Sequence, residues 1–265
     1  MAVPIGLIPG MVREEIERDL FGTLEKIAEI GYKGLEFGRF KDFLPGQVRT
    51  KLESLGLTAI CHHTTYEELE SDFDGVVNYA LAFGCRYLVL NWHTYDSLED
   101  VHTCAAFYNT IGKRCAQKGI QFCYHNHAHE FWKYGEKRAF DIIMEETEPA
   151  YLKIQFDTFW FSIAGLKIGD YMVKYAGRFP LVHFQDKIPD NADIKIEKQP
   201  DGYPDYSPLL TEIGTGVVDF AAIASLGERC GAQWFTVEQW IPGKKYPPLE
   251  SIRMSFDNLR KLRLA

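Results

Sequence analysis

The stretch Phe122-Cys123-Tyr124-His125-Asn126-His127-Ala128-His129-Glu130-Phe131 joins a short apolar run to three histidines and a glutamate. The apolar residues at its start predict a buried strand, and the polar side chains follow where that strand should end. A closed core would leave these imidazole and carboxylate groups without hydrogen-bond partners, which is costly. Imidazoles and carboxylates are also common metal ligands. The stretch therefore predicts a buried strand that ends at a functional site.

The same succession of strand, helix and glycine repeats along the whole chain. The expected strands cover residues 3–9, 34–38, 57–61, 86–90, 120–124, 152–156, 181–183 and 234–237. The expected helices cover residues 14–30, 47–55, 66–83, 98–118, 138–146, 168–176, 218–228 and 251–262. Eight strand–helix units without a linker predict an α/β fold of the (β/α)8 TIM-barrel class, in one domain over residues 1–265. A doubly wound open sheet is the alternative, but no glycine-rich dinucleotide motif follows the first strand.

Composition and charge exclude several classes of protein. The chain has 265 residues, 46% of them hydrophobic, and a formal net charge of −8 with no run of lysine or arginine. This argues against nucleic acid or an anionic membrane as the main partner, because both need a basic surface. No apolar run approaches the roughly 18 residues of a membrane span, and no signal peptide is recognised at the N-terminus. Six cysteines without a CxxC pair indicate reduced thiols, so we expect a cytoplasmic protein.

Polar side chains follow the carboxyl ends of most expected strands. A single one is more often a capping or loop residue, but strand ends in a barrel converge on the face where active sites are built. Asp157, His183 and Glu238 follow three consecutive strands, and such a mixed oxygen and nitrogen set suits Mn²⁺, Mg²⁺, Co²⁺ or Zn²⁺. The nine residues are His62, His63, Asn91, His93, His125, His127, Asp157, His183 and Glu238.

Five motifs in the second half of the chain resemble the xylose-isomerase-like superfamily of sugar isomerases and epimerases. They cover residues 124–131, 155–160, 183–186, 214–219 and 235–238. The resemblance implies a (β/α)8 barrel with one divalent metal, bound by a Glu, an Asp, a His and a second Glu from strands five to eight. It assigns three of these ligands to Asp157, His183 and Glu238. Tyr-His-Asn-His at 124–127 also resembles the Tyr-His-His-His of inosose dehydratases, which eliminate water from a keto-inositol.

The chain departs from the family pattern at the fifth strand. The family glutamate would fall near Tyr124 or His125, where no carboxylate stands, and Glu130 lies several residues later. We expect His125, or alternatively His127, to be the fourth ligand, because neutral imidazole is a good donor for these metals. We expect Mn²⁺ as the metal.

The activity implied by the resemblance is metal-dependent isomerisation or epimerisation of a keto-sugar. Such reactions begin when a base removes the proton next to a metal-polarised carbonyl. Glu238 or Glu130 is the expected base, and His127 or His93 the partner acid. Tryptophans just beyond strand ends suit stacking on a sugar. The expected substrate contacts are His62, His93, Trp160 and Lys187.

Three alternative functions remain open. A keto-sugar lyase, dehydratase or deglycosidase of the same superfamily shares the first step. A DNA-repair endonuclease would need more metal ligands and a basic surface. A non-catalytic sugar-binding subunit would keep only a vestigial metal site. The loop over residues 188–213 is long enough to be functional, so we expect it to cover the barrel mouth or to pair with another subunit of a homo-oligomer.

Overall fold

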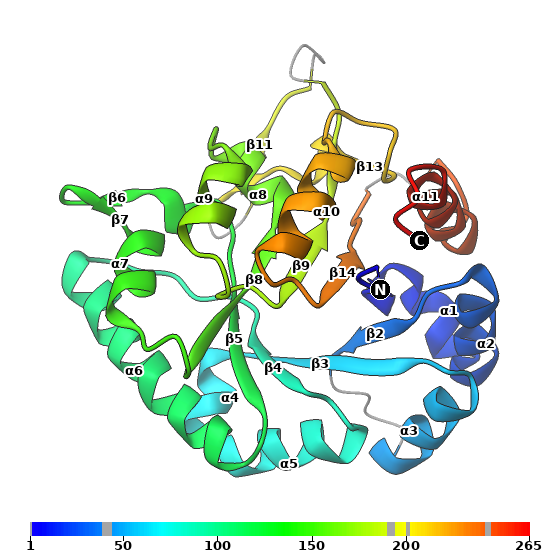
Figure 1. The fold of residues 1–265 in the computed structure, drawn as a ribbon, viewed down its shortest axis with the longest axis horizontal. Coiled ribbons are helices and arrows are strands. Elements are labelled where there is room, and N and C mark those ends of the chain that lie inside the picture. The colour runs from blue at the N-terminus through cyan, green and yellow to red at the C-terminus, as the bar shows by residue number, and fades with distance from the viewer. Residues whose placement is uncertain (1, 39–43, 190–193, 200–201, 242–244) are drawn as a thin grey trace.

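The computed structural model describes residues 2–38, 44–189, 194–199, 202–241 and 245–265 and shows a closed barrel of eight parallel strands (Figure 1). The strands follow one another around the barrel in the order β1-β14-β9-β8-β5-β4-β3-β2. The prediction of a (β/α)8 TIM barrel is therefore confirmed. The barrel strands are β1 (Ile5–Leu7), β2 (Gly34–Phe37), β3 (Thr58–Thr64), β4 (Tyr87–Leu90), β5 (Gln121–His125), β8 (Leu152–Asp157), β9 (Leu181–Phe184) and β14 (Trp234–Val237).

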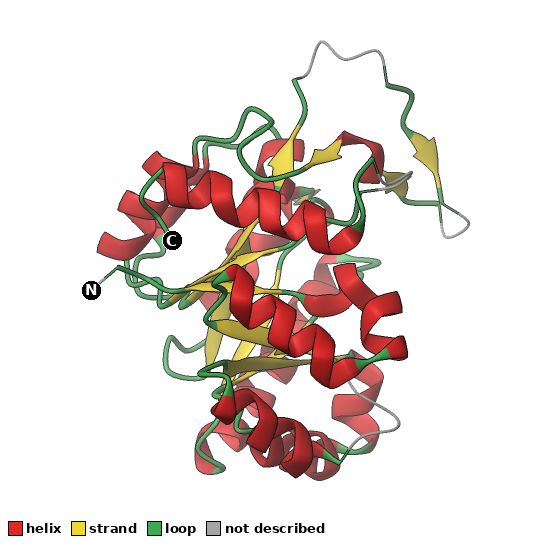
Figure 2. Ribbon diagram, turned by 90° about the vertical axis from the view of Figure 1, so that its right-hand side faces the viewer, coloured by secondary structure: helices red, strands yellow, loops and turns green. Residues whose placement is uncertain are grey.

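Helices surround the barrel and shield its outer face from water (Figures 1 and 2). None of the helices in the described ranges is long and apolar enough to cross a membrane. The α-helices are α1 (Arg13–Arg18), α2 (Leu20–Ile30), α3 (Pro45–Ser54), α4 (Tyr66–Ser71), α5 (Phe73–Phe83), α6 (Leu98–Gln117), α7 (Ala139–Glu146), α8 (Thr158–Ile163), α9 (Ile168–Lys174), α10 (Phe220–Arg229) and α11 (Pro248–Lys261). Short 3-10 turns occur at η1 (Pro9–Val12), η2 (His129–Phe131) and η3 (Ser207–Leu209).

Two helices expected to be continuous are each divided at an aspartate. Asp19 lies between α1 and α2 in an extended conformation, and its side chain accepts a hydrogen bond of 2.9 Å from the Gly22 backbone N–H. Asp72 divides α4 from α5 in the same way, at 3.1 Å from the Gly75 N–H. An aspartate that caps a new helix in this way gives the backbone an alternative to the continuing helix. Apolar spacing alone does not reveal such a break.

Two glycines leave room for a large side chain inside the barrel. A Cβ atom on Gly6 would lie 2.5 Å from Cδ1 of Ile60, and one on Gly34 would lie 2.7 Å from Cγ1 of the same isoleucine. Ile60 belongs to a small buried apolar cluster with residues from β4, β5 and β9, which include Val89 and Cys123. The barrel interior is therefore packed at this level, and the polar residues of the interior lie nearer the carboxyl ends of the strands.

The expected loop over residues 188–213 contains ordered structure. β10 (Asp186–Lys187) pairs antiparallel with β13 (Leu210–Thr211), and β11 (Glu197–Lys198) pairs with β12 (Pro204–Asp205). The β11–β12 hairpin projects from the barrel (Figure 2). Residues 190–193 and 200–201 of this loop lie outside the described residues. A further hairpin, β6 (Lys133–Tyr134) with β7 (Lys137–Arg138), follows η2.

Candidate metal centre

Four side chains meet at the carboxyl ends of β5, β8, β9 and β14. His125, Asp157, His183 and Glu238 each offer one ligand atom, and these four atoms all lie within 4.8 Å of one another. The four strands are consecutive in the barrel wall, so their ends are neighbours in space. Asp157 and His183 are fully buried, His125 is 5% exposed, and the Glu238 side chain is 12% exposed. The structure thus brings together the four residues that the sequence assigned to a metal.

The charges in this cluster fit a cation. Burial and the charge of Glu238 raise the pKa of Asp157. Burial, together with neighbouring His183, lowers the pKa of His125 to about 3, which keeps this imidazole in the neutral form that binds metals. The buried Nδ1 atom of His125 has no hydrogen-bond partner within the described part of the chain. A divalent ion would relieve the repulsion between the carboxylates and give the imidazole a partner.

His183 is held between two carboxylates. Its Nδ1 atom lies 2.6 Å from Oε2 of Glu238 and 3.8 Å from Oδ2 of Asp157, while its Nε2 atom lies 3.0 Å from Oε2 of Glu36. Burial opposes the charged imidazole, but Glu36 and Glu238 outweigh it and raise the pKa of His183 well above its usual value. A metal would replace the proton on Nδ1, and the Nε2–H group would still donate to Glu36. Such an outer carboxylate commonly orients a metal-binding histidine.

Glu36 on β2 is the residue that sequence reasoning missed. It is 1% exposed, and its Oε2 atom is the acceptor for several groups in the barrel interior. Besides His183, these are Nε2 of His63 at 2.8 Å, Nε2 of Gln155 at 2.8 Å and Sγ of Cys61 at 3.2 Å. The sequence signal that could have identified Glu36 is that it is the one acidic residue in the otherwise apolar strand β2. Glu36 thus links the candidate metal cluster to the strands β2 and β3 across the barrel.

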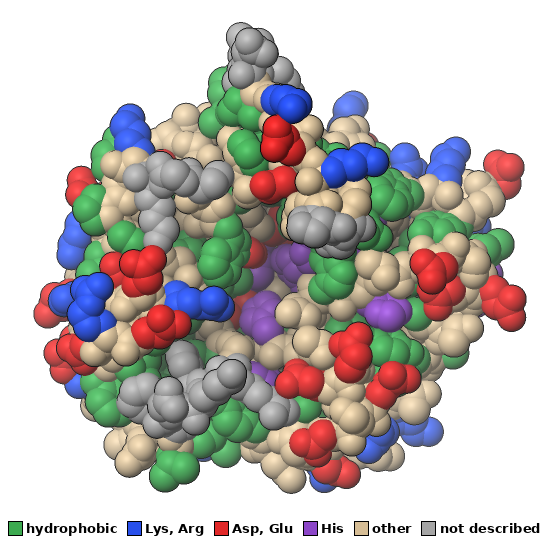
Figure 3. Space-filling view, turned by 180° about the vertical axis from the view of Figure 1, so that it is seen from behind, with side chains coloured by type: hydrophobic (Ala, Val, Ile, Leu, Met, Phe, Trp, Pro, Cys, Tyr) green, Lys and Arg blue, Asp and Glu red, His purple; other side chains and the backbone are tan. Residues whose placement is uncertain are grey.

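Three members of the cluster line a cavity of about 850 Å³, and histidine side chains are visible in the hollow of this face in Figure 3. His125, His183 and Glu238 lie on one wall of this cavity, and His63 and Asn91 belong to other strands of the barrel. This volume exceeds that of a single sugar ring and leaves room for a larger substrate. The remaining lining residues include Ile8, Pro9, Gly10, Arg13, Ile16, Glu17, Glu36, Gly38, Trp92, His127 and Trp240.

The structure corrects the expectation that His62 and His93 contact the substrate. His62 is 1% exposed, and its ring centroid lies 5.1 Å from that of Tyr79 on α5. Side chains alternate along a strand, so His62 faces the helices while its neighbour His63 faces the cavity. His93 stacks on Tyr66 with ring centroids 4.2 Å apart and does not belong to the cavity lining.

Two further expected substrate contacts also lie outside the cavity lining. Trp160 packs against His127, with ring centroids 5.0 Å apart. Lys187 is 5% exposed and belongs to the β10–β13 sheet. Contact of either residue with a substrate would need a rearrangement of the cavity wall. Neither residue therefore enters the chemistry proposed below.

The position of Glu130 in the structure corrects the expectation that this residue is the base. It is fully buried, its Oε1 atom accepts a hydrogen bond from the Tyr124 hydroxyl, and its Oε2 atom lies 2.8 Å from the His127 backbone N–H. Its carboxylate also lies 3.2 Å from Nε2 of His129. Glu130 therefore holds the turn after β5. His127 does line the cavity, where its ring packs on Trp92 with centroids 4.5 Å apart.

Part of the long loop reaches the rim of the cavity. Tyr203 stacks on Trp132, with ring centroids 5.8 Å apart and an interplanar angle of 5°. It also meets the edge of Trp92, a cavity-lining residue, at 5.5 Å. The prediction that residues 188–213 cover the whole mouth stays a prediction, because several of them lie outside the described residues.

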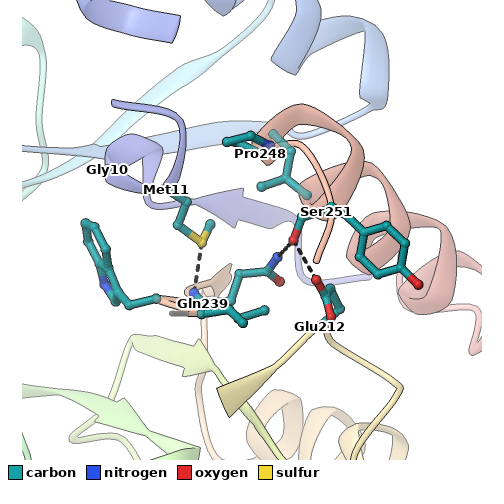
Figure 4. A pocket seen from close by; sticks show the side chains of 10 residues that line it. Gly10, Met11, Glu212, Gln239, Pro248 and Ser251 are labelled. Carbon is teal, nitrogen blue, oxygen red and sulfur yellow. Dashed lines mark hydrogen bonds between the residues drawn. The ribbon is translucent and has the colours of Figure 1, made fainter. Parts of the chain in front are cut away.

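Trp240 separates the large cavity from a smaller one of about 190 Å³. Its Nε1–H group donates a hydrogen bond of 2.7 Å to Oε1 of Glu238. In the small cavity, Gln239 donates to Ser251 at 2.6 Å, and Ser251 donates to Glu212 at 3.1 Å (Figure 4). The two carboxylate oxygens of Glu238 therefore have different partners, Trp240 for Oε1 and His183 for Oε2.

A closed (β/α)8 barrel with a buried carboxylate–imidazole cluster at the carboxyl ends of its strands defines a class of barrel whose active face is suited to a metal. Within this class, residues 24–262 match the family described as xylose isomerase-like TIM barrel. The chain belongs to this family. The resemblance deduced from the sequence motifs is confirmed.

The relatives point to carbohydrate chemistry. An inosose dehydratase from Geobacillus kaustophilus (strain HTA426) is 25% identical over 250 residues, which cover 82% of this chain and 78% of the relative. An inosose dehydratase from Lacticaseibacillus casei is 23% identical over 282 residues and covers 94% of each chain. The chain is therefore an enzyme-family member with dehydratase relatives at low identity.

Solved structures share the fold at lower identity. A sugar phosphate isomerase/epimerase from Parabacteroides distasonis ATCC 8503 has a TM-score of 0.77 at 19% identity, covering 98% of this chain and 94% of the other. The structure of the IOLI protein with a binding zinc atom has a TM-score of 0.75 at 14% identity, covering 98% and 97%. These likenesses establish the barrel architecture.

Proposed function

We propose that this protein is a divalent-metal-dependent lyase acting on a keto-sugar or keto-cyclitol. It removes the proton next to the carbonyl and then eliminates an oxygen substituent from the following carbon. The observation that carries the proposal is the convergence of His125, Asp157, His183 and Glu238 within 4.8 Å, beside a cavity of about 850 Å³ that His125, His183 and Glu238 line. Buried carboxylates and imidazoles in a cavity are the groups that such chemistry needs.

The four clustered side chains would hold one metal ion. Imidazole and carboxylate ligands suit Mn²⁺, Co²⁺ or Zn²⁺ better than Mg²⁺, which prefers oxygen ligands alone. Mn²⁺ is our first choice, and the zinc-binding IOLI neighbour supports a divalent ion in general. When bound, the metal polarises the carbonyl oxygen of the substrate and so acidifies the neighbouring C–H group.

Glu238 is the base in this proposal. Trp240 holds its Oε1 atom at 2.7 Å and His183 contacts its Oε2 atom at 2.6 Å, so the carboxylate has a fixed orientation. In the metal-free protein burial raises the pKa of Glu238, but the charge of His183 and its hydrogen bond outweigh burial and leave the pKa lowered. A bound cation would favour the ionised carboxylate in place of the His183 proton. Glu238 is thus ionised near neutral pH and ready to accept the proton.

Elimination is favoured over return of the proton by two observations. The relatives described above are inosose dehydratases, which are lyases. In addition, neither Tyr124 nor His125 is a carboxylate, although the resembling epimerases carry a second acid–base glutamate near this point of the fifth strand. Isomerisation or epimerisation is the second candidate, because it shares the first step. The presence of His63 in the cavity lining favours it, since an imidazole away from the cluster wall could return a proton to the other face.

A solvent-exchange experiment tests the proposal. Metal-free protein is reloaded with Mn²⁺ and incubated in D₂O with a keto-inositol, keto-sugars and 3-keto-glycosides, and the reactions are followed by NMR. We expect metal-dependent exchange of the hydrogen next to the carbonyl together with an unsaturated product. Exchange that yields only a new stereoisomer or aldose would establish the second candidate. A protein that binds no metal and exchanges no hydrogen would contradict enzymatic function and favour a sugar-binding role.

A further inference from the structure

We propose that His63 is the acid that protonates the departing oxygen, and that Glu36 is the residue that positions it. This inference rests on the proposed lyase function and deepens it. It assigns a role to a part of the barrel interior that lies outside the candidate metal ligands.

The hydrogen bond to Glu36 determines how His63 is oriented. The Nε2 atom of His63 lies 2.8 Å from Oε2 of Glu36, a carboxylate that is 1% exposed. Because that oxygen can only accept, Nε2 carries the hydrogen and the ring is held in one orientation. Within the described ranges Nδ1 of His63 makes no hydrogen bond, and the side chain is 18% exposed on the cavity. Nδ1 is therefore the nitrogen available to a substrate.

The barrel order places His63 on the strand opposite that of His183, one of the candidate ligands. These ligands follow β5, β8, β9 and β14, whereas His63 lies on β3. Three strands separate β3 from β9 in either direction around the barrel, so the two strands are opposite each other. The ring centroids of His63 and His183 are 6.3 Å apart. Glu238 follows β14, which β1 and β2 separate from β3, so Glu238 and His63 would reach a substrate held at the cluster from different strands of the barrel wall.

His127 is a less suitable acid, although it also lines the cavity. Its ring packs against Trp92, His125 and Trp160, with centroid distances of 4.5, 4.7 and 5.0 Å. Its Nδ1 atom is buried without a hydrogen-bond partner in the part of the chain that the structure describes. Among the described residues, no carboxylate is hydrogen-bonded to this ring. A histidine paired with a carboxylate is the common arrangement for proton transfer, and His63 has that arrangement.

Glu238 and His63 would carry out the elimination in two proton transfers. Glu238 takes the proton from the carbon next to the carbonyl, and the C–H electron pair forms the carbon–carbon double bond of the enolate. The carbonyl then re-forms, the electron pair of the enolate double bond becomes the new double bond to the next carbon, and the bond between that carbon and its oxygen substituent breaks with its electron pair going to the oxygen. The Nδ1 proton of protonated His63 passes to this oxygen, which leaves as water or an alcohol. His63 becomes neutral and regains a proton from solvent, and Glu238 releases its proton to solvent.

The test separates the first proton transfer from the departure of the oxygen. Mn²⁺-loaded His63→Gln, His63→Ala and wild-type proteins are compared with a keto-inositol in D₂O. His62→Gln is the matched control, because this neighbouring histidine packs on Tyr79 of α5. For both His63 variants we expect hydrogen exchange within about threefold of wild type and product formation lower by roughly 10²–10⁴-fold. The control should keep both rates and a metal content of one ion per chain.

A better leaving group provides a second readout that a purely structural role would not change. Fluoride departs with less help from an acid than hydroxide, so a β-fluoro analogue of the keto-inositol should shrink the defect of both His63 variants to less than about tenfold. The assignment would be overturned if the His63 variants lost product formation by the same factor with fluoride as with hydroxyl as the leaving group. It would also be overturned if hydrogen exchange and product formation fell by the same factor, or if neither rate fell. Wild-type protein that exchanges no hydrogen would instead refute the lyase function itself.

Discussion

The substitution Asp157→Asn should stabilise the metal-free protein while weakening metal binding. Asp157 is fully buried beside Glu238, and both carboxylates carry charge in the absence of a metal at high pH. Asparagine removes one of these charges and keeps the side-chain oxygen that accepts a hydrogen bond of 3.0 Å from the Trp160 N–H at the start of α8. Stability and metal affinity should therefore change in opposite directions.

The magnitude follows from the pKa of Asp157. Burial and the charge of Glu238 raise this pKa from 3.8 to about 7. The native state therefore binds the proton more tightly than the unfolded chain, and wild-type protein loses stability as the pH rises between these two values. Relative to a pH below 3.8, where both states hold the proton, this difference lowers the free energy of unfolding by about 4 kcal/mol at pH 8 and about 2 kcal/mol at pH 5. Asparagine avoids this cost but loses the 2.7 Å hydrogen bond from Gln185, worth about 1–3 kcal/mol.

The variant should gain roughly 1–3 kcal/mol at pH 8 and little at pH 5. Thermal unfolding in the presence of a chelator measures this difference, which for a chain of this size corresponds to about 4–8 °C for 2 kcal/mol. Saturating Mn²⁺ should raise the melting temperature of wild type clearly and that of the variant much less. Asp72→Asn is the matched control, because Asp72 also caps a helix but lies far from the cluster in sequence.

Two results would refute this reasoning. One is a metal-free Asp157→Asn protein that is less stable than wild type at both pH values. The other is a stability difference that does not change between pH 5 and pH 8. Either would mean that the buried carboxylates do not repel each other in the folded protein, and the case for a cation among them would lose its electrostatic basis.

Three further predictions concern the candidate metal site and the rim of the large cavity. Glu238→Gln should bind metal but lower hydrogen exchange by roughly 10²–10⁴-fold; wild-type exchange with normal metal content would show that Glu238 is not the base. His125→Glu restores the carboxylate of the resembling family, so it should lower metal-free stability and raise Mn²⁺ affinity, as calorimetry can measure; unchanged affinity would remove His125 from the ligand set. Tyr203→Ala removes the ring that stacks on Trp132 at 5.8 Å, so KM should rise more than kcat falls; unchanged kinetics would exclude the loop from substrate binding.

The barrel could be predicted from the sequence because helix-period spacing and glycine stops recur eight times. The candidate metal ligands could be placed together because each lies at a strand end, and strand ends in a barrel converge. Asp157, His183 and Glu238 needed only this rule and the motif resemblance. His125 needed the further step that imidazole can replace a carboxylate. The positions of these four side chains in the structure agree with that reasoning.

The remaining site residues depended on which way a side chain points. His62 and His63 are adjacent and chemically identical, and only the register of β3 decides that His63 faces the cavity. Its place just after the fifth strand makes Glu130 a candidate base, but the turn of η2 brings its carboxylate into hydrogen bonds with the Tyr124 hydroxyl and the His127 N–H. Glu36 was missed because no metal motif contains it. Sequence spacing identifies strand ends more readily than it identifies buried hydrogen-bond partners.

The candidate ligands all belong to the second half of the chain, whereas Glu36 and His63 belong to the first. The halves adjoin where β4 pairs with β5 and where β1 pairs with β14. A recombinant chain joined between β4 and β5 would thus inherit its metal ligands from one parent and the opposite wall from the other. The hydrogen bond between Glu36 and His183 crosses this division. Shuffling of half-barrels could therefore exchange substrate preference among relatives while the metal ligands stay intact, provided that the acceptor at position 36 is kept.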